Sequence, residues 1–185
     1  MIVTAITLLA VVAIVPIVVA LGRSRIPSWR AHSTRVDVGA GALLITLAGV
    51  AALFALPAAH AAGAGLVLAR ICALAAAVTG GAPVVRSVLA AGGVVPRPPG
   101  DGNADPDAAG PLRGGRVIGY LERLAVAGTL LAGWPEGLAI ILAVKSLARF
   151  PELRAPHASE QFIMGTFASV LWAVSMVGIG HLIVV

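Results

Sequence analysis

Four charged residues lie within or against apolar stretches of this chain, and their chemistry needs an explanation. Glu122 and Arg123 follow an apolar segment, Lys145 ends another, and Arg70 lies inside a third. A charged side chain in hydrocarbon costs several kcal/mol, so such residues usually have a partner or a function. We predict a buried charge cluster near the cytoplasmic side that consists of Glu122, Arg123, Arg70, Lys145 and Arg149.

Glu122 has a side chain too short to reach the membrane surface easily. A carboxylate at this depth should be protonated or should face a basic partner. We expect Glu122 to point towards another helix and to pair with Arg70 or, less deep, with Lys145 or Arg149. A structural ion pair and a proton- or ligand-binding site both remain open.

The basic residues also have a simpler interpretation, in which their stems lie in lipid and their charged groups reach the interface. Lys145 and Arg149 are four residues apart and therefore share one helix face. Arg123 lies about 10 Å from the start of its span, so it could reach the interface as well. We predict contacts with lipid headgroups at Lys145, Arg149 and Arg154.

Small residues recur at helical spacing beside these charges. One predicted helix face carries Gly119, Glu122, Ala125, Thr129 and Gly133 and is bordered by Val126. A later apolar run carries Gly165-x-x-x-Ser169-x-x-x-Ala173. Membrane helices associate through such small side chains. We predict that Gly119, Gly165 and Ser169 are helix-packing positions. A second small-residue face beside Arg70 consists of Gly65, Ala69, Cys72, Ala76 and Gly80.

The elements that must position these residues are membrane helices, as composition indicates. The chain has 185 residues, is 59% hydrophobic and 11% charged, and has a mean hydropathy of +0.99. A soluble domain is about half apolar and about a quarter charged. The net charge of +5 comes from basic residues scattered between apolar runs, so they are better interpreted as topology determinants than as a nucleic-acid surface.

Several chemistries are absent from the sequence. The single cysteine, Cys72, excludes an internal disulfide and a multi-cysteine metal site. The chain has no phosphate-binding loop, no His-Glu-x-x-His helix and no Gly-x-Ser-x-Gly motif. We therefore expect neither a metal ion nor a cofactor.

The predicted fold is an all-α membrane protein with six transmembrane helices in two sets of three and both termini outside. A Pro-, Gly- and Asp-rich linker over residues 96–114 separates a first half, residues 1–95, from a second half, residues 115–185. An extension of the third span through Arg86 to Val95 is left open. The spans are predicted at residues 1–21, 38–59, 61–83, 116–134, 136–150 and 162–185. The orientation follows because loops 22–36, 84–116 and 149–161 are basic, whereas the opposite turns contain no Lys or Arg.

The second half resembles a bacterial membrane-protein family of unknown function. The resemblance rests on Ile118-Gly119-Tyr120-Leu121-Glu122-Arg123, on Lys145-Ser146-Leu147-Ala148-Arg149-Phe150, and on Gly165-Thr166-Phe167-Ala168-Ser169. It covers residues 115–180 and implies that Glu122, Lys145 and Arg149 act as a set. It implies no particular reaction.

Three functions are consistent with these residues. The favoured one is a non-enzymatic structural or accessory component of the cell membrane, with anionic lipids of the cytoplasmic leaflet, a second copy or another membrane protein as partners. The second is a small transporter or channel with Glu122 and Arg70 in a polar path. The third is a membrane enzyme acting on a lipid phosphate, in which Lys145, Arg149 and Arg123 hold the headgroup and Glu122 is the general base.

Overall fold

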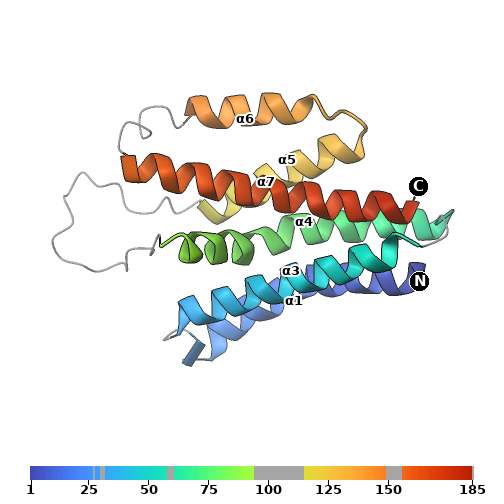
Figure 1. Ribbon diagram of the computed structural model, residues 1–185, viewed down its shortest axis with the longest axis horizontal. Helices are drawn as coiled ribbons and strands as arrows, with labels where there is room; N and C mark the ends of the chain where they lie inside the picture. The colour runs from blue at the N-terminus through green and yellow to red at the C-terminus, as the bar shows by residue number, and fades with distance from the viewer. Residues whose placement is uncertain (27, 30–31, 58–60, 94–114, 149–155, 185) are drawn as a thin grey trace.

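The chain folds into a bundle of long helices that run roughly along one axis (Figure 1). The computed structural model describes residues 1–26, 28–29, 32–57, 61–93, 115–148 and 156–184, with side chains in the last range from Ser159 onwards. No strand occurs in these ranges. The helices are α1 (Ile2–Arg25), α3 (Ser33–Ala55), α4 (Ala64–Ala91), α5 (Gly115–Leu131), α6 (Gly137–Ala148) and α7 (Pro156–Val184).

Four of these helices are long and apolar enough to cross a membrane: α1, α3, α4 and α7. Their outward faces carry large apolar side chains such as Ile14, Leu53 and Phe167, all more than half exposed in the isolated chain. Such faces are compatible with a lipid environment. The helix α5 has 17 residues and α6 has 12, which at 1.5 Å per residue gives about 25 Å and about 18 Å.

The helix boundaries differ from the predicted spans at the basic end of the first half. The sequence placed residues 22–36 in a polar loop, but α1 continues to Arg25 and α3 begins at Ser33. Several arginines in a row predict a loop by their charge, but the long stem of arginine also allows it to lie on the last turn of a membrane helix. The extension of the third span is confirmed as far as Ala91, because α4 continues through Pro83 and Arg86 and ends there. Val95, where the extension was predicted to end, lies outside the described residues. The predicted linker, residues 96–114, lies wholly outside the described residues.

The helices α4 and α7 form the centre of the bundle (Figure 1). On one side α1 and α3 pack against α4 and against each other, while α5 packs on α4 and α7 and carries α6. The helix α7 also contacts α3 and α1, so it joins elements from both parts of the sequence.

Small residues allow α4 and α7 to approach closely. The indole Nε1 of Trp172 donates a hydrogen bond of 3.0 Å to the carbonyl oxygen of Ala76. A Cβ at Gly80 would lie 2.5 Å from the Trp172 ring, and one at Gly180 would lie 2.7 Å from the Cβ of Ala73. Both glycines are therefore required by close packing, as is usual between membrane helices.

A tight turn joins α5 to α6. Gly133 adopts a φ of 73°, and the N–H of Trp134 donates to the carbonyl oxygen of Thr129 at 2.9 Å. The N–H of Gly133 donates to the carbonyl oxygen of Leu130 at 3.1 Å. This pair of bonds is a Schellman motif, in which glycine supplies the left-handed residue. Pro135 follows at once, because it cannot continue the helix.

The two termini lie at the same end of the bundle (Figure 1). The start of α4 lies there too, since the N–H of Ala61, just before α4, donates to the carbonyl oxygen of Ile183 near the end of α7 at 2.9 Å. The opposite end, which we call the basic end, contains the end of α1, the start of α3 and the start of α5. Among the described residues, the arginine and lysine side chains at this end are Arg23, Arg25, Arg35, Arg86, Arg116 and Lys145, whereas Arg70 and Arg123 lie further along the bundle.

The packing of α7 on α4 predicts different outcomes at two nearby glycines. Gly180→Leu should lower the free energy of unfolding in detergent by about 1–3 kcal/mol, because the new side chain has no space beside Ala73. Gly178→Leu is the matched control, since Gly178 is exposed and a Cβ added there would meet nothing within 4 Å. Thermal unfolding followed by circular dichroism compares them. Equal melting temperatures of the two variants would contradict the close packing of α7 on α4 at Gly180.

Candidate functional site

An ion pair joins α5 to α6 in the second half of the chain. The Nζ of Lys145 lies 2.6 Å from an oxygen of Glu122, and the two side chains are only 20% and 24% exposed. This is one of the pairings that the sequence predicted. Lys145 also lies 5.7 Å from the ring centroid of Phe162 in α7. The pair therefore ties α6 to the bundle near the basic end.

Arg123 points the other way, into the bundle. It is 4% exposed, its Nε donates to the carbonyl oxygen of Val78 in α4 at 2.9 Å, and its Nη1 lies 3.4 Å from the Oγ of Ser169 in α7. Its guanidinium carbon is 5.4 Å from the ring centroid of Tyr120. The sequence allowed Arg123 to reach the interface, but its guanidinium instead forms a polar contact between α5, α4 and α7.

Glycines make room for this arginine. A Cβ at Gly81 would lie 2.6 Å from the Nε of Arg123, closer than real side chains approach. One at Gly119 would lie 3.4 Å from Nη1. Gly119, which the sequence assigned to helix packing, therefore lies beside the guanidinium. A Cβ at Gly165 would lie 3.8 Å from the Val85 side chain of α4, and Ser169 is buried where α7 meets Arg123.

The face of α5 that packs into the bundle is also different from the predicted one. The sequence expected Glu122 and Ala125 to line a small-residue packing face bordered by Val126. The residues of α5 that are buried are Arg123, Val126 and Ala127, while Ala125 is exposed. Glu122 still points towards another helix, but that helix is the short α6.

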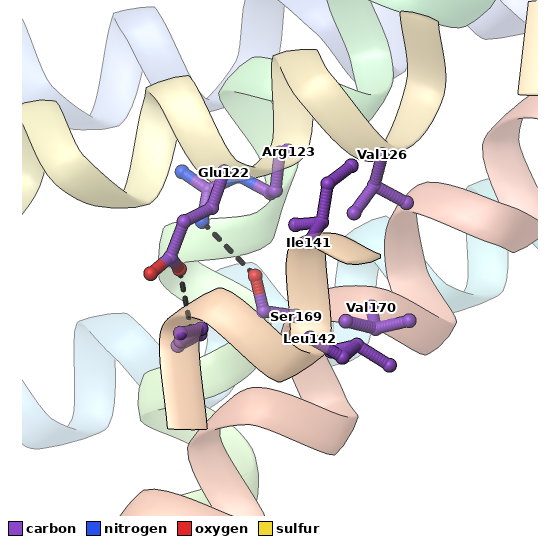
Figure 2. Close-up of a pocket in the computed structure, with 8 residues that line it drawn as sticks. Glu122, Arg123, Val126, Ile141, Leu142, Ser169 and Val170 are labelled. Atoms are coloured by element: carbon purple, nitrogen blue, oxygen red, sulfur yellow. Dashed lines mark hydrogen bonds and ion pairs between the residues drawn. The ribbon is translucent and has the colours of Figure 1, made fainter. Parts of the chain in front are cut away.

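The space around the pair is small. Figure 2 shows Glu122 and Arg123 on neighbouring positions of α5, with the bonds to Lys145 and Ser169 dashed. The cavity beside them has a volume of about 10 Å³, room for roughly one water molecule. Its wall is completed by apolar side chains, namely Val126, Ile141, Leu142 and Val170.

Arg70 does not join this cluster, which corrects the prediction. It is the seventh residue of α4, it is exposed, and it has no hydrogen bond or ion pair to any residue that the structure describes. It lies about 12 Å along α4 from Val78, where Arg123 binds. The sequence indicated its depth but not the direction around the helix axis. Arg149 and Arg154, predicted for the cluster and for lipid contacts, lie outside the described residues.

The structure also shows a buried carboxylate that sequence reasoning missed. Asp37, near the start of α3, is 7% exposed and pairs through its Oδ1 with Arg23 of α1 and with Arg86 of α4. The Arg86 Nε lies 2.7 Å from that oxygen, and the Oγ of Ser87 lies 2.8 Å from the Asp37 carbonyl oxygen. This network, which we call the Asp37 network, joins the basic ends of three helices.

A signal for Asp37 was available in the sequence. It is the single acidic residue before Asp101, in a segment that holds seven arginines. A lone carboxylate among so many guanidinium groups is a strong candidate for an ion pair. The predicted polar loop ends at residue 36 and the predicted span begins at residue 38, so Asp37 falls between the two and receives no role.

Pro16 interrupts the hydrogen bonding of α1, and a threonine of α4 lies beside the interrupted turn. Pro16 in α1 lacks the N–H that would bind the Val12 carbonyl, and this loosens the hydrogen bonding of the turn. The hydroxyl of Thr79 in α4 lies 2.9 Å from the carbonyl oxygen of Ala13 and 2.8 Å from that of Ala75 in its own helix. Its single proton can bond either oxygen, so Thr79 provides a polar contact between α4 and α1.

Comparison with protein-family models, with curated proteins and with solved structures finds no match to this chain. Its function is therefore inferred from its own contacts.

The Glu122–Lys145 pair predicts a coupled effect on stability. Glu122→Gln or Lys145→Gln each leaves one charge without its partner and should lower the free energy of unfolding by about 1–3 kcal/mol. The double variant should lose less than the sum of the two, because the interaction is already gone in either single variant. Unfolding in detergent gives the free energies of unfolding of the parent protein, the two single variants and the double variant. Glu160→Gln, an exposed position at the start of α7, is the control. Strictly additive losses would contradict the pair.

The Asp37 network predicts that one neutralised carboxyl affects three helices. Asp37→Asn should lower the melting temperature in detergent more than Arg35→Gln, a nearby exposed position on the same helix. The loss should be about 1–3 kcal/mol, because Arg23 and Arg86 then face each other without a counter-charge but remain partly solvated. Equal stability of the two variants would show that Asp37 contributes nothing to the fold.

Proposed function

We propose that this chain is a small multi-pass protein of the cell membrane that serves as a structural or accessory component rather than as a catalyst. In this proposal α5 and α6 also cross the bilayer, which gives six spans with both termini outside. The position of both termini at one end, opposite the basic end, supports that topology (Figure 1). A role in the bacterial inner membrane, in line with the family that the second half resembles, is part of the proposal.

The observation that carries the proposal is that the interior charges are engaged by other helices. Glu122 is paired with Lys145, Arg123 binds a carbonyl and a hydroxyl, and Asp37 is paired with two arginines. Charges that are satisfied in this way stabilise a particular arrangement of helices. A general base or a transport site needs a group that can change its partner, and these groups are already bound.

The other two functions gain less support from the geometry. A polar path from Glu122 to Arg70 would require the two residues to line one cavity, but Arg70 is exposed and the cavity at Glu122 has a volume of about 10 Å³. An enzyme that uses Glu122 as general base and Lys145 for the headgroup would have to break the ion pair between them before each reaction.

A flux measurement tests the structural role against the transport role. Protein reconstituted in liposomes with an internal pH-sensitive dye should show no proton flux above that of empty vesicles when a potassium gradient drives it. Glu122→Gln should lower the stability without changing the flux, because the Glu122 carboxylate stabilises the fold through its pair with Lys145. A flux that is present in the parent protein, lost in Glu122→Gln and kept in Glu160→Gln, with equal melting temperatures, would replace the proposal by a transporter.

A further inference from the structure

A groove lies on the side of α4 that faces away from α3 and α7. Both α1 and α5 pack against α4, but within the described residues they do not pack against each other. The space left between them has a volume of about 500 Å³. This volume is within the usual range for a ligand site, about 300–1,000 Å³. It is far larger than the cavity beside Glu122.

One end of the groove is strongly basic. Three arginines line it, one from each helix: Arg23 of α1, Arg86 of α4 and Arg116 of α5. None of the residues that line it is acidic. Ser24 and Tyr120 also line the groove, whereas the hydroxyl of Thr79 lies deeper, within bonding distance of the Ala13 and Ala75 carbonyl oxygens. Guanidinium groups bind phosphate oxygens with paired, charge-assisted hydrogen bonds, so this wall suits a phosphate.

The arginines retain a positive charge after their internal pairing is counted. Within the described residues, Asp37 is the carboxylate paired with Arg23 and Arg86, so the three arginines of the groove face one described negative charge. The Arg86 side chain is still 35% exposed, and Arg116 is exposed on the first turn of α5 with no hydrogen bond or ion pair to a described residue. An anion in the groove could therefore interact with the positive charges of Arg86 and Arg116.

The other end of the groove is apolar. On α1 the lining changes from Arg23 and Ser24 to Ala20, Val19, Ile17 and Pro16. The distance from Arg23 to Pro16 is about 10 Å along the helix axis. Polar and apolar ends are thus separated along the direction in which a membrane lipid extends. The basic end lies at the level expected for headgroups, and the apolar end lies at the level of acyl chains.

From this arrangement we propose that the groove between α1, α4 and α5 binds one anionic phospholipid. Its phosphate lies against Arg86, Arg116 and Arg23, and the start of an acyl chain lies along Ile17 and Ala20. The position differs from that of the Glu122–Lys145 pair, because Arg116 and Tyr120 are one turn apart on a face of α5 that Glu122 does not share. The proposal requires a membrane protein but does not depend on a structural or accessory role.

Lipid-dependent stabilisation tests the site in the full chain. Purified protein is delipidated in a neutral detergent, and its melting temperature is followed as phosphatidylglycerol, phosphatidylcholine or inorganic phosphate is added. Phosphatidylglycerol should raise the melting temperature, whereas the other two additions should have little effect. Because ligand that binds the folded state stabilises it by mass action, the titration also gives an apparent affinity.

Variants locate the effect in the groove. Arg116→Gln removes a charge that no described residue uses, so the protein should fold, and its apparent affinity for phosphatidylglycerol should fall roughly fivefold. Ala20→Leu, at an exposed position, should weaken binding by filling the apolar end without altering charge. Arg25→Gln and Arg35→Gln are controls, because these arginines lie at the same end of the bundle but do not line the groove.

Four outcomes would overturn the proposal. Equal stabilisation by phosphatidylcholine would mean that only apolar filling matters, and stabilisation by inorganic phosphate alone would mean a small-anion site. Equal losses in Arg25→Gln and Arg116→Gln would mean diffuse attraction to an anionic surface. A change in oligomeric state of Arg116→Gln on gel filtration would mean that a second copy covers the groove. None of these outcomes would alter the liposome flux on which the proposed function depends.

Discussion

The cost of leaving a charged or hydrogen-bonding group unpaired in hydrocarbon decides where the polar side chains of this chain lie. Arg123 illustrates the constraint, because its guanidinium is buried and reaches a carbonyl oxygen of α4 and a hydroxyl of α7. The pairing of Glu122 with Lys145 obeys the same rule. Each of these contacts joins two helices that apolar surfaces alone would not hold in one register, since lipid competes equally for those surfaces.

Glycine is what makes the polar contacts geometrically available. The side chain of Arg123 fits against α4 because Gly81 has no Cβ, and Trp172 reaches the Ala76 carbonyl because Gly80 has none. A larger residue at either place would separate the helices and leave the donor unbonded. The many small residues therefore serve two purposes, close helix packing and access of side chains to the backbone of a neighbouring helix.

The sequence predicts the helices well and the side-chain partners unevenly. The lengths of the apolar runs alone indicate α1, α3, α4 and α7. The similar expected depths of Glu122 and Lys145 in the membrane were enough to suggest that they pair. Arg70 failed as a partner because depth along a helix does not say which way a side chain points. Asp37 was missed because the sequence does not show where α1 ends and α3 begins: both helices extend into a segment rich in arginine, which resembles a loop. These facts depend on tertiary packing, which a single sequence does not display.

The arrangement of charges has a consequence for how the two parts of the chain are joined. The Asp37 network ties α1, α3 and α4 together, and Arg123 ties α5 to α4 and α7. Between α1 and α5, however, the described chain provides no direct packing, and arginines from both sides face the gap. Mutual repulsion of these guanidinium groups opposes closure of the gap. An anionic lipid in the groove would replace that repulsion with attraction, so the spacing of α1 and α5 should depend on the lipid that surrounds the protein.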